Sequence, residues 1–172
     1  MGTTFNDSGV AIDRTVHALK TIDAVHHEIH EGEHFEASNV QTAQTAFDWL
    51  VTTPVDKYVH MVTQLVSIGA CTLTVYRAAT ATASANAVTP VNNNHNSSKT
   101  AGTAICHTPT SITTGSDIVD RQLLAAGNNQ GAQSRNDLER ILLPNTKYLF
   151  RFAAGTPTDV LIRWMFYEEP EL

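Results

Sequence analysis

The sequence predicts an all-β fold, an antiparallel β-sandwich or jelly roll that carries an N-terminal arm. Two observations lead to this prediction. In the last third of the chain, short segments alternate between apolar and polar residues, which is the pattern of half-buried strands. Clusters of turn-forming residues separate these segments, and the sequence shows no credible buried helix between them.

The clearest strands are residues 148–152 and 160–167, and a Pro144–Asn145 turn precedes the first of them. One face of each strand collects most of the aromatic and β-branched side chains. We therefore expect this face to lie in a core between two sheets, with the second strand central and buried. The residues of the face are Tyr148, Phe150, Phe152, Val160, Ile162, Trp164 and Phe166.

The middle of the chain adds further strands of the same kind. They are expected at residues 47–51, 58–68, 70–77, 104–108 and 118–124. Only Gly69 and its neighbours separate the second of these strands from the third, which predicts a hairpin. Residues 78–100 hold no convincing strand and are expected to be a long exposed loop, which includes the Asn-rich segment 91–98. A second loop is expected at residues 127–136.

Length and composition suit one folded domain and exclude several classes of function. The formal net charge is −6, and no basic stripe supplies the clustered Lys and Arg that a nucleic-acid surface needs. No segment approaches the ~18 continuous apolar residues of a membrane helix, and the start lacks the features of a signal peptide. We therefore expect no nucleic acid and no membrane as a partner, and a protein that is used without secretion. Cys71 and Cys106 lie in apolar runs and are expected to be buried free thiols.

Residues 1–35 are expected to form an N-terminal arm, followed by a β-sandwich domain of residues 36–172. The first 12 or so residues are small and polar, as in a mobile arm. From Val16 to Ile29 the apolar positions are three or four residues apart, which fits one stripe of a helix. The Thr, Val, Ile and His content of this segment also allows an extended conformation, so both remain open.

The densest chemistry lies at the end of this arm, where residues 30–34 spell H-E-x-x-H, the zinc peptidase motif. The motif requires a helix, because only the i, i+4 spacing brings both imidazoles to one metal ion. Gly32 costs about 1 kcal/mol of helix stability relative to Ala, and Glu33 adds a second charge inside the motif. His26, His30 and His34 recur every four residues, so they are the candidates for a structural metal site on a helix.

The sequence favours another interpretation of this cluster, a polar hinge whose imidazoles and carboxylates hydrogen-bond each other and a neighbouring chain. We expect His26, His27, His30, Glu31 and His34 to make this partner contact without a bound metal. Histidine titrates near pH ~6.5, so the acidic neighbours would make such a contact sensitive to pH. The sequence has no P-loop, no G-x-S-x-G elbow and no dinucleotide fingerprint, and we expect no catalytic residue, no cofactor and no enzyme activity.

Several stretches resemble small virion proteins of tailed bacteriophages. Residues 22–35, IDAVHHEIHEGEHF, resemble an opening run that precedes a β-sandwich in this family. Residues 92–97, NNNHNS, resemble its mid-chain Asn/Ser loop. Residues 143–151, LPNTKYLFR, together with residues 164–168, resemble its last strands, while the Ala/Thr-rich residues 78–89 have no identified counterpart.

The resemblance implies a capsid decoration or cement protein, a structural virion protein without catalytic residues. We expect it to be assembled in the host cytoplasm and to coat the capsid exterior, as a homotrimer bound to the major capsid protein. The alternative is a carbohydrate- or receptor-binding β-sandwich module of a phage tail or head fibre, with the Asn-rich segment as its binding surface. Trp49 and Trp164 would stack on sugars if exposed, but Trp164 lies on the predicted core face.

Overall fold

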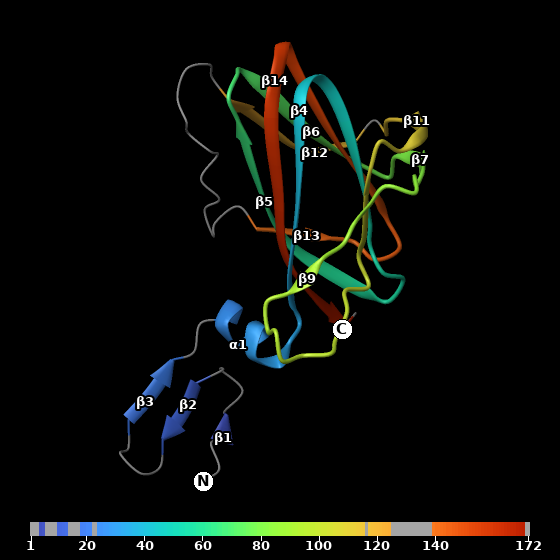
Figure 1. The fold of residues 1–172 in the computed structure, drawn as a ribbon. Coiled ribbons are helices and arrows are strands. Elements are labelled where there is room, and N and C mark those ends of the chain that lie inside the picture. The colour runs from blue at the N-terminus through green and yellow to red at the C-terminus, as the bar shows by residue number, and fades with distance from the viewer. Residues whose placement is uncertain are drawn as a thin grey trace.

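The computed structural model describes residues 4–5, 10–13, 18–21, 24–115, 117–124 and 139–170. Antiparallel strands make up most of this part of the chain, and the helix within it is α1, Ala24–Glu31. The predicted all-β class is therefore confirmed: one large curled sheet is accompanied by two small sheets (Figure 1). None of the described residues belongs to a helix long and apolar enough to cross a lipid bilayer.

A three-stranded antiparallel sheet lies within the predicted arm. Its strands, in order across the sheet, are β1 Thr4–Phe5, β2 Val10–Asp13 and β3 Ala18–Thr21. Between positions 16 and 29, the described residues therefore show both conformations that the sequence allows. Residues 18–21 are extended, and the chain is helical from residue 24.

Within the described residues, the large sheet has nine strands. Its central pair is β4, His34–Thr52, and β14, Lys147–Pro170, and the strands beside β14 are β5, Lys57–Ser67, and β6, Cys71–Arg77. The other strands are β8 Ala87–Val88, β9 Val91–Asn92, β10 Ala104–His107, β12 Asp117–Leu124 and β13 Arg140–Leu142. A separate two-stranded sheet contains β7 Thr80–Thr82 and β11 Thr110–Thr113.

β4 and β14 pair with each other along most of their length, and both bend at the same level. The register of the pair shifts between Ala153 and Val160, next to Ala43, whose φ is 53°. Before this shift β14 also pairs with β6, and after it with β5. The bend therefore divides the curled sheet into two halves, a β5 half and a β6 half, which share the two long strands.

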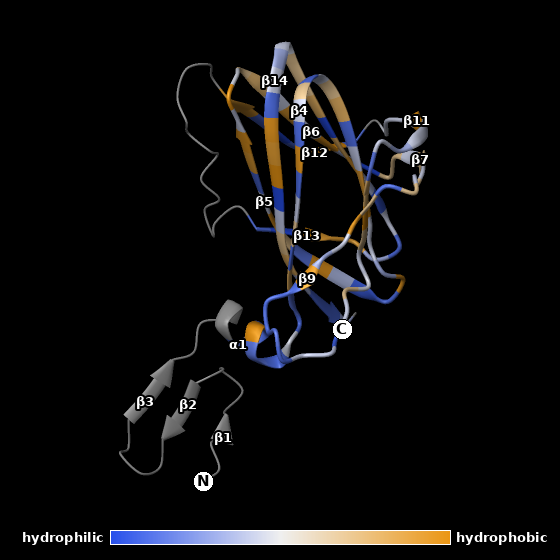
Figure 2. Cartoon of the chain, in the orientation of Figure 1, coloured by the Kyte–Doolittle hydropathy of each residue, from blue (hydrophilic) through white to orange (hydrophobic). Residues whose placement is uncertain are grey.

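The core lies between these two halves. The seven residues of the predicted aromatic face are all buried, none of them more than 2% exposed. Trp164, on the β5 half, meets Trp49 and Phe150, on the β6 half, edge-on, with ring centroids 6.2 and 5.9 Å apart. Figure 2 shows apolar residues recurring along β5 and β14, the strands that line this core. The central, buried position predicted for residues 160–167 is confirmed.

One predicted strand connection is wrong. Residues 58–68 and 70–77 do form strands, β5 and β6, but the two strands do not make a hairpin. Each pairs with a different part of β14, so the chain crosses from one half of the sheet to the other at Gly69. The N–H of Gly69 donates a 2.8 Å hydrogen bond to Oγ1 of Thr158, which fixes this crossing at the bend of β14.

Other local predictions are confirmed or refined. The strands expected at 47–51, 104–108 and 118–124 lie in β4, β10 and β12, and Cys71 and Cys106 are buried free thiols. The two strands predicted at 148–152 and 160–167 are parts of the single strand β14. Residues 78–100, expected to lack strands, contain β7, β8 and β9, which are only two or three residues long and therefore lack a readable alternation. Residues 127–136, the second expected loop, lie outside the described residues.

Candidate contact site at the end of helix α1

Helix α1 ends inside the H-E-x-x-H motif. The N–H of Gly32 donates to the carbonyl of Ile29 at 3.1 Å, and the N–H of Glu33 donates to the carbonyl of Glu28 at 2.9 Å. This pair of hydrogen bonds is the Schellman motif, and it requires the positive φ of Gly32, 73°. The helix therefore stops before His34, which begins β4, and His30 and His34 do not share a helix face.

The Asn-rich loop, residues 91–98, closes over this helix end. Nδ2 of Asn94 donates to the carbonyl of His30 at 3.1 Å, and Nδ2 of Asn92 donates to the carbonyl of Gly32 at 2.8 Å. The last carbonyls of a helix have no partners within the helix, so these amides satisfy groups that would otherwise need water. We call the end of α1, the start of β4 and the Asn-rich loop together the α1 junction.

The loop is also held by its own side chains. Oδ1 of Asn92 accepts from the N–H of Asn94 at 2.9 Å, and Oδ1 of Asn94 accepts from the N–H of Asn96 at 3.1 Å. Directly after the loop, Lys99 forms a 2.5 Å ion pair with Glu33, and this hydrogen bond raises the pKa of Lys99. The Asn-rich part of the predicted exposed loop is therefore a folded cap in which Asn92, Asn93 and Asn94 are partly buried.

His34 is fixed by the neighbouring loop residue Asn93. The N–H of Asn93 donates to the carbonyl of His34 at 3.0 Å, and Nδ2 of Asn93 donates to the ring atom Nδ1 at 2.8 Å. His34 is only 7% exposed. Burial lowers the pKa of His34, and the nearby carboxylate of Glu36 only partly opposes this effect. The ring is thus held in its neutral form with Nδ1 as the acceptor.

His34 lies in a row of aromatic rings across the sheet. In the register of the strands, Tyr167 of β14 lies between His34 of β4 and His60 of β5. The rings of His60 and Tyr167 stack with centroids 4.5 Å apart, and Glu139 lies 2.6 Å from Nδ1 of His60. The Tyr167 hydroxyl donates to Glu139 at 3.0 Å. Burial, and then Glu139, raise the pKa of Tyr167 above its ordinary range, and Glu28 of α1 adds to the effect.

The predicted contact residues are divided by this arrangement. The side chains of His27, His30 and Glu31 lie on the exposed part of the helix end, where Nδ1 of His27 is 3.4 Å from the carboxylate of Glu28. His34 instead is buried in the junction. His26 belongs to α1, but its side chain lies outside the described residues. Among the side chains that the structure describes, no group of three or more His, Cys, Asp or Glu is placed to hold a metal ion.

A buried carboxylate that sequence reasoning missed anchors Gly102 and Thr103, a few residues after the Asn-rich loop. Glu168 is 3% exposed, and its Oε1 accepts from both the N–H and the hydroxyl of Thr103 at 2.7 Å. Its Oε2 accepts from the N–H of Gly102 at 3.1 Å and lies 3.6 Å from Nζ of Lys57. Every second residue of β14 from Val160 to Phe166 faces the core, and Glu168 is the next residue in this series. The same rule would therefore have predicted that Glu168 faces the core.

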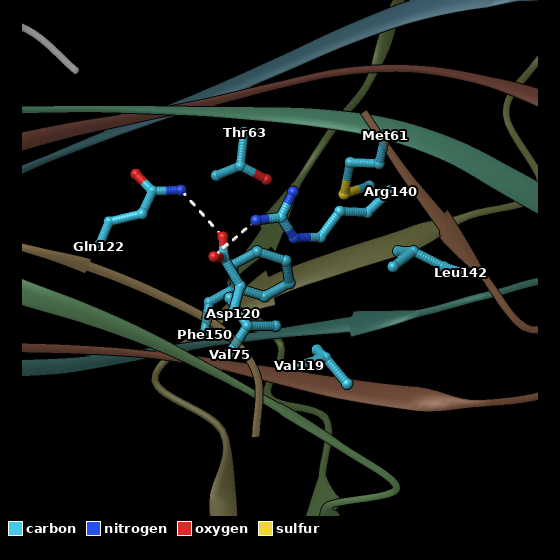
Figure 3. Close-up of a pocket in the computed structure, with 9 residues that line it drawn as sticks. All are labelled: Met61, Thr63, Val75, Val119, Asp120, Gln122, Arg140, Leu142 and Phe150. Atoms are coloured by element: carbon cyan, nitrogen blue, oxygen red, sulfur yellow. Dashed lines mark hydrogen bonds and ion pairs between the residues drawn. The ribbon is translucent and has the colours of Figure 1, made fainter. Parts of the chain in front are cut away.

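A pocket between β12, β13 and the two halves of the sheet is too small for a substrate. Its polar wall is Asp120, which accepts from Arg140 at 2.6 Å and from Nε2 of Gln122 at 3.1 Å (Figure 3). The other lining residues are Met61, Thr63, Val75, Val119, Leu142 and Phe150. The cavity measures about 20 Å³, room for a single water molecule, whereas small-molecule sites measure roughly 300–1,000 Å³.

The α1 junction is therefore the candidate functional site. Its interior is held by hydrogen bonds between backbone carbonyls and asparagine amides, and its exposed rim carries imidazoles and carboxylates. Such a surface can bind another chain through polar contacts. Compared with protein-family models, curated proteins and solved structures, the chain gives no significant match to any of them.

Proposed function

We propose that this chain is a non-enzymatic structural virion protein that decorates and stabilises the outer surface of a phage capsid. One observation carries the proposal. Two stretches that resemble the virion proteins, residues 22–35 and 92–97, are far apart in sequence, yet their described residues meet in the α1 junction. A shared junction is what two segments of one functional surface would form. The proposed partner at this surface is the major capsid protein.

The shape of the sheet and the position of the α1 junction in it also support the proposal. We take the bent sheet to be a two-layered β-sandwich of the jelly-roll kind, because its two halves bury a common core and share both long strands. Sandwiches of this kind present loops and strand ends at the ends of the layers. The α1 junction occupies one such end, away from the bend of β4 and β14 (Figure 1).

The carbohydrate- or receptor-binding alternative is less well supported. Trp49 and Trp164 are both fully buried, so neither offers a platform on which a sugar ring could stack. The side chains of Asn92, Asn93 and Asn94, which would have to read sugar hydroxyls, already hold the helix end and His34.

The experiment that tests the proposal is a binding assay on purified, undecorated capsids. The full-length protein is expected to pellet with capsids. The arm is tested with a form that lacks residues 1–23, because β4 begins at His34 and a cut at 35 would remove buried Phe35 from the core. A protein that stays in the supernatant with capsids, yet binds purified tails, would show that the capsid placement is wrong.

A matched pair of variants tests the site itself. Lys99→Glu places two like charges where Lys99 now pairs with Glu33, and should open the junction and weaken capsid binding. Arg121→Glu makes the same charge change at an exposed position of β12 and should bind like the parent. If both variants bind capsids equally well, the α1 junction is not the surface that contacts the capsid. The mass of the free protein then tests the proposed three-fold association, which requires a number of chains that is a multiple of three.

A further inference from the structure

β4 is paired along most of one side, but in the described part of the chain its other side is paired along only part of its length. β14 pairs with it along one side, and the other side carries β9 at residues 35–36 and β10 at residues 49–52. Between these two, no strand in the described part of the chain pairs with that side of β4. In a sheet, alternate residues of such a stretch direct their N–H and C=O groups away from the paired neighbour. Residues 37–43, the β4 edge, are therefore open to another strand.

The β4 edge lacks the features that usually keep edge strands apart. Native edges are commonly protected by charged side chains, especially Lys, or by Pro. Between Glu36 and Asp48 the chain has no charged residue and no Pro. Val40, in the middle of the edge, is 62% exposed. The stretch ends at Ala43, where the positive φ bends the strand.

Val40 also ends an apolar row on the outer face of the sheet. In the register of the strands, Val66 of β5, Leu161 of β14 and Val40 of β4 lie side by side. Val66 and Leu161 are half-buried, and Val40 is the most exposed of the three. An added strand with an apolar residue opposite Val40 would lengthen this row and remove apolar surface from water, which is favourable by about 25 cal/mol per Å².

We propose that the β4 edge pairs antiparallel with the same edge of a second copy of this chain, around a two-fold axis at Val40. In this register Val40 lies opposite Val40 of the second copy, and Ser38 lies opposite Thr42. Asn39 lies opposite Gln41, so that no like charges meet. Pairs of β-branched side chains and pairs of hydroxyls stabilise neighbouring antiparallel strands. The edge is thus complementary to itself, as a two-fold interface requires.

The surface beside the edge leaves room for a second strand. A shallow groove runs along its first residues and is lined by Glu36, Ala37, Ser38, Thr89, Val91, Asn93 and His95. This contact does not depend on the proposed capsid role. It is also separate from the proposed three-fold association, because a two-fold contact and a three-fold contact use different symmetry axes.

Sedimentation of the full-length protein over a range of concentrations tests the contact. The parent should form an even-numbered assembly, and Val40→Lys should halve its mass, because each Lys would face its own copy. Ile68→Lys is the matched control, since Ile68 is 69% exposed but lies outside the edge. A parent that stays monomeric or trimeric, or a Val40→Lys protein of unchanged mass, would overturn the proposal.

Single cysteines test the register. Residues directly opposite in antiparallel strands have Cα atoms about 4.5–5.5 Å apart, within the range of about 4.4–6.8 Å for disulfides. Val40→Cys should therefore form a disulfide-linked dimer under mild oxidation, and both native cysteines are buried. Thr42→Cys should not link to itself, but should link to Ser38→Cys when the two proteins are mixed. No link from Val40→Cys, or equal linking of Thr42→Cys to itself, contradicts the two-fold axis at Val40.

Discussion

The side-chain amide of Asn93 donates a 2.8 Å hydrogen bond to Nδ1 of His34, across 59 residues of sequence. The bond joins the Asn-rich loop to the first residue of β4. It also fixes the state of the ring, because an Nδ1 that accepts a hydrogen bond carries no proton. Protonation of His34 at Nδ1 would therefore break the bond and place a charge in a buried position.

The first prediction concerns the pH dependence of folding. The pKa of His34 in the folded state lies below its ordinary value of 6.5, so between these two values the unfolded chain binds more protons than the folded one. His34 should therefore reduce the free energy of unfolding as the pH falls below 6.5, with the loss complete below the folded-state pKa. Urea titrations at a series of pH values measure this slope.

A variant isolates the contribution of His34. His34→Gln cannot take up a proton in this range, and should flatten the pH profile between neutral and mildly acidic values. His95→Gln, at an exposed position of the same loop, should keep the profile of the parent. If His34→Gln and the parent show the same slope, another group is responsible.

The second prediction concerns Gly32. An added Cβ there would lie 2.7 Å from Cβ of Ser97 and would have to adopt a φ of 73°. Gly32→Ala should therefore lower the free energy of unfolding by at least about 1 kcal/mol. Gly155→Ala is the control, because a Cβ at Gly155 meets nothing within 4 Å. Chemical denaturation of both variants measures the difference, and equal stability would contradict the structure of the junction.

The third prediction concerns the centre of the core. Trp164 is fully buried between two aromatic rings, so Trp164→Ala should cost about 3–5 kcal/mol in the free energy of unfolding. Met165→Ala removes a half-buried side chain from the opposite face of the same strand and should cost clearly less. Similar losses for the two variants would mean that the inner face of β14 is misassigned.

The fourth prediction concerns Glu168. Glu168→Ala leaves the two buried donors of Thr103 without their acceptor, which should cost about 1–3 kcal/mol for each group left unpaired. It also removes the acceptor of the N–H of Gly102, which is exposed and can bond to water instead. Glu169→Ala, at the next and exposed position, should be near neutral. The rate of proteolysis within residues 99–103 measures how well this segment is held. It should rise in Glu168→Ala and not in Glu169→Ala.

The fifth prediction concerns metal binding. We expect the purified protein to carry no stoichiometric zinc and to cleave no peptide, because α1 ends between His30 and His34 and Nδ1 of His34 already accepts from Asn93. Elemental analysis after dialysis is the measurement. One zinc ion per chain, lost in His30→Ala, would show instead that the junction rearranges into a metal site.

Much of the fold could be predicted because alternation reports which face of a strand is buried. Tyr148 to Phe166 followed this rule, and the same rule extended to Glu168 would have found the buried carboxylate. Alternation does not report which strands pair, and a short turn at Gly69 looks the same in a hairpin and in a crossing between the halves of the sheet. The hairpin error follows from that ambiguity.

The candidate site was less predictable from the sequence. In a zinc-binding helix Gly32 is only a defect, although a glycine at this position is also the usual signal for the end of a helix. The residue that hydrogen-bonds the ring of His34 is Asn93, 59 positions away, and no local pattern links two residues so far apart. The Asn-rich loop looks like an exposed segment because its asparagines are polar. Asn92 and Asn94 bond instead to backbone carbonyls, and since every residue has a carbonyl, the sequence does not identify these partners.

The pairing of β4 with β14 also determines when this chain can fold. Arg151 forms a two-pronged ion pair with Asp48, 103 residues earlier, at 2.8 and 2.9 Å. Contacts between residues so far apart in sequence slow folding, because a long loop must close before they form. Since β14 begins only at Lys147, β4 leaves the ribosome well before this partner and cannot pair with it until β14 has been made. Chaperones that bind extended apolar segments would meet this chain while it is being made.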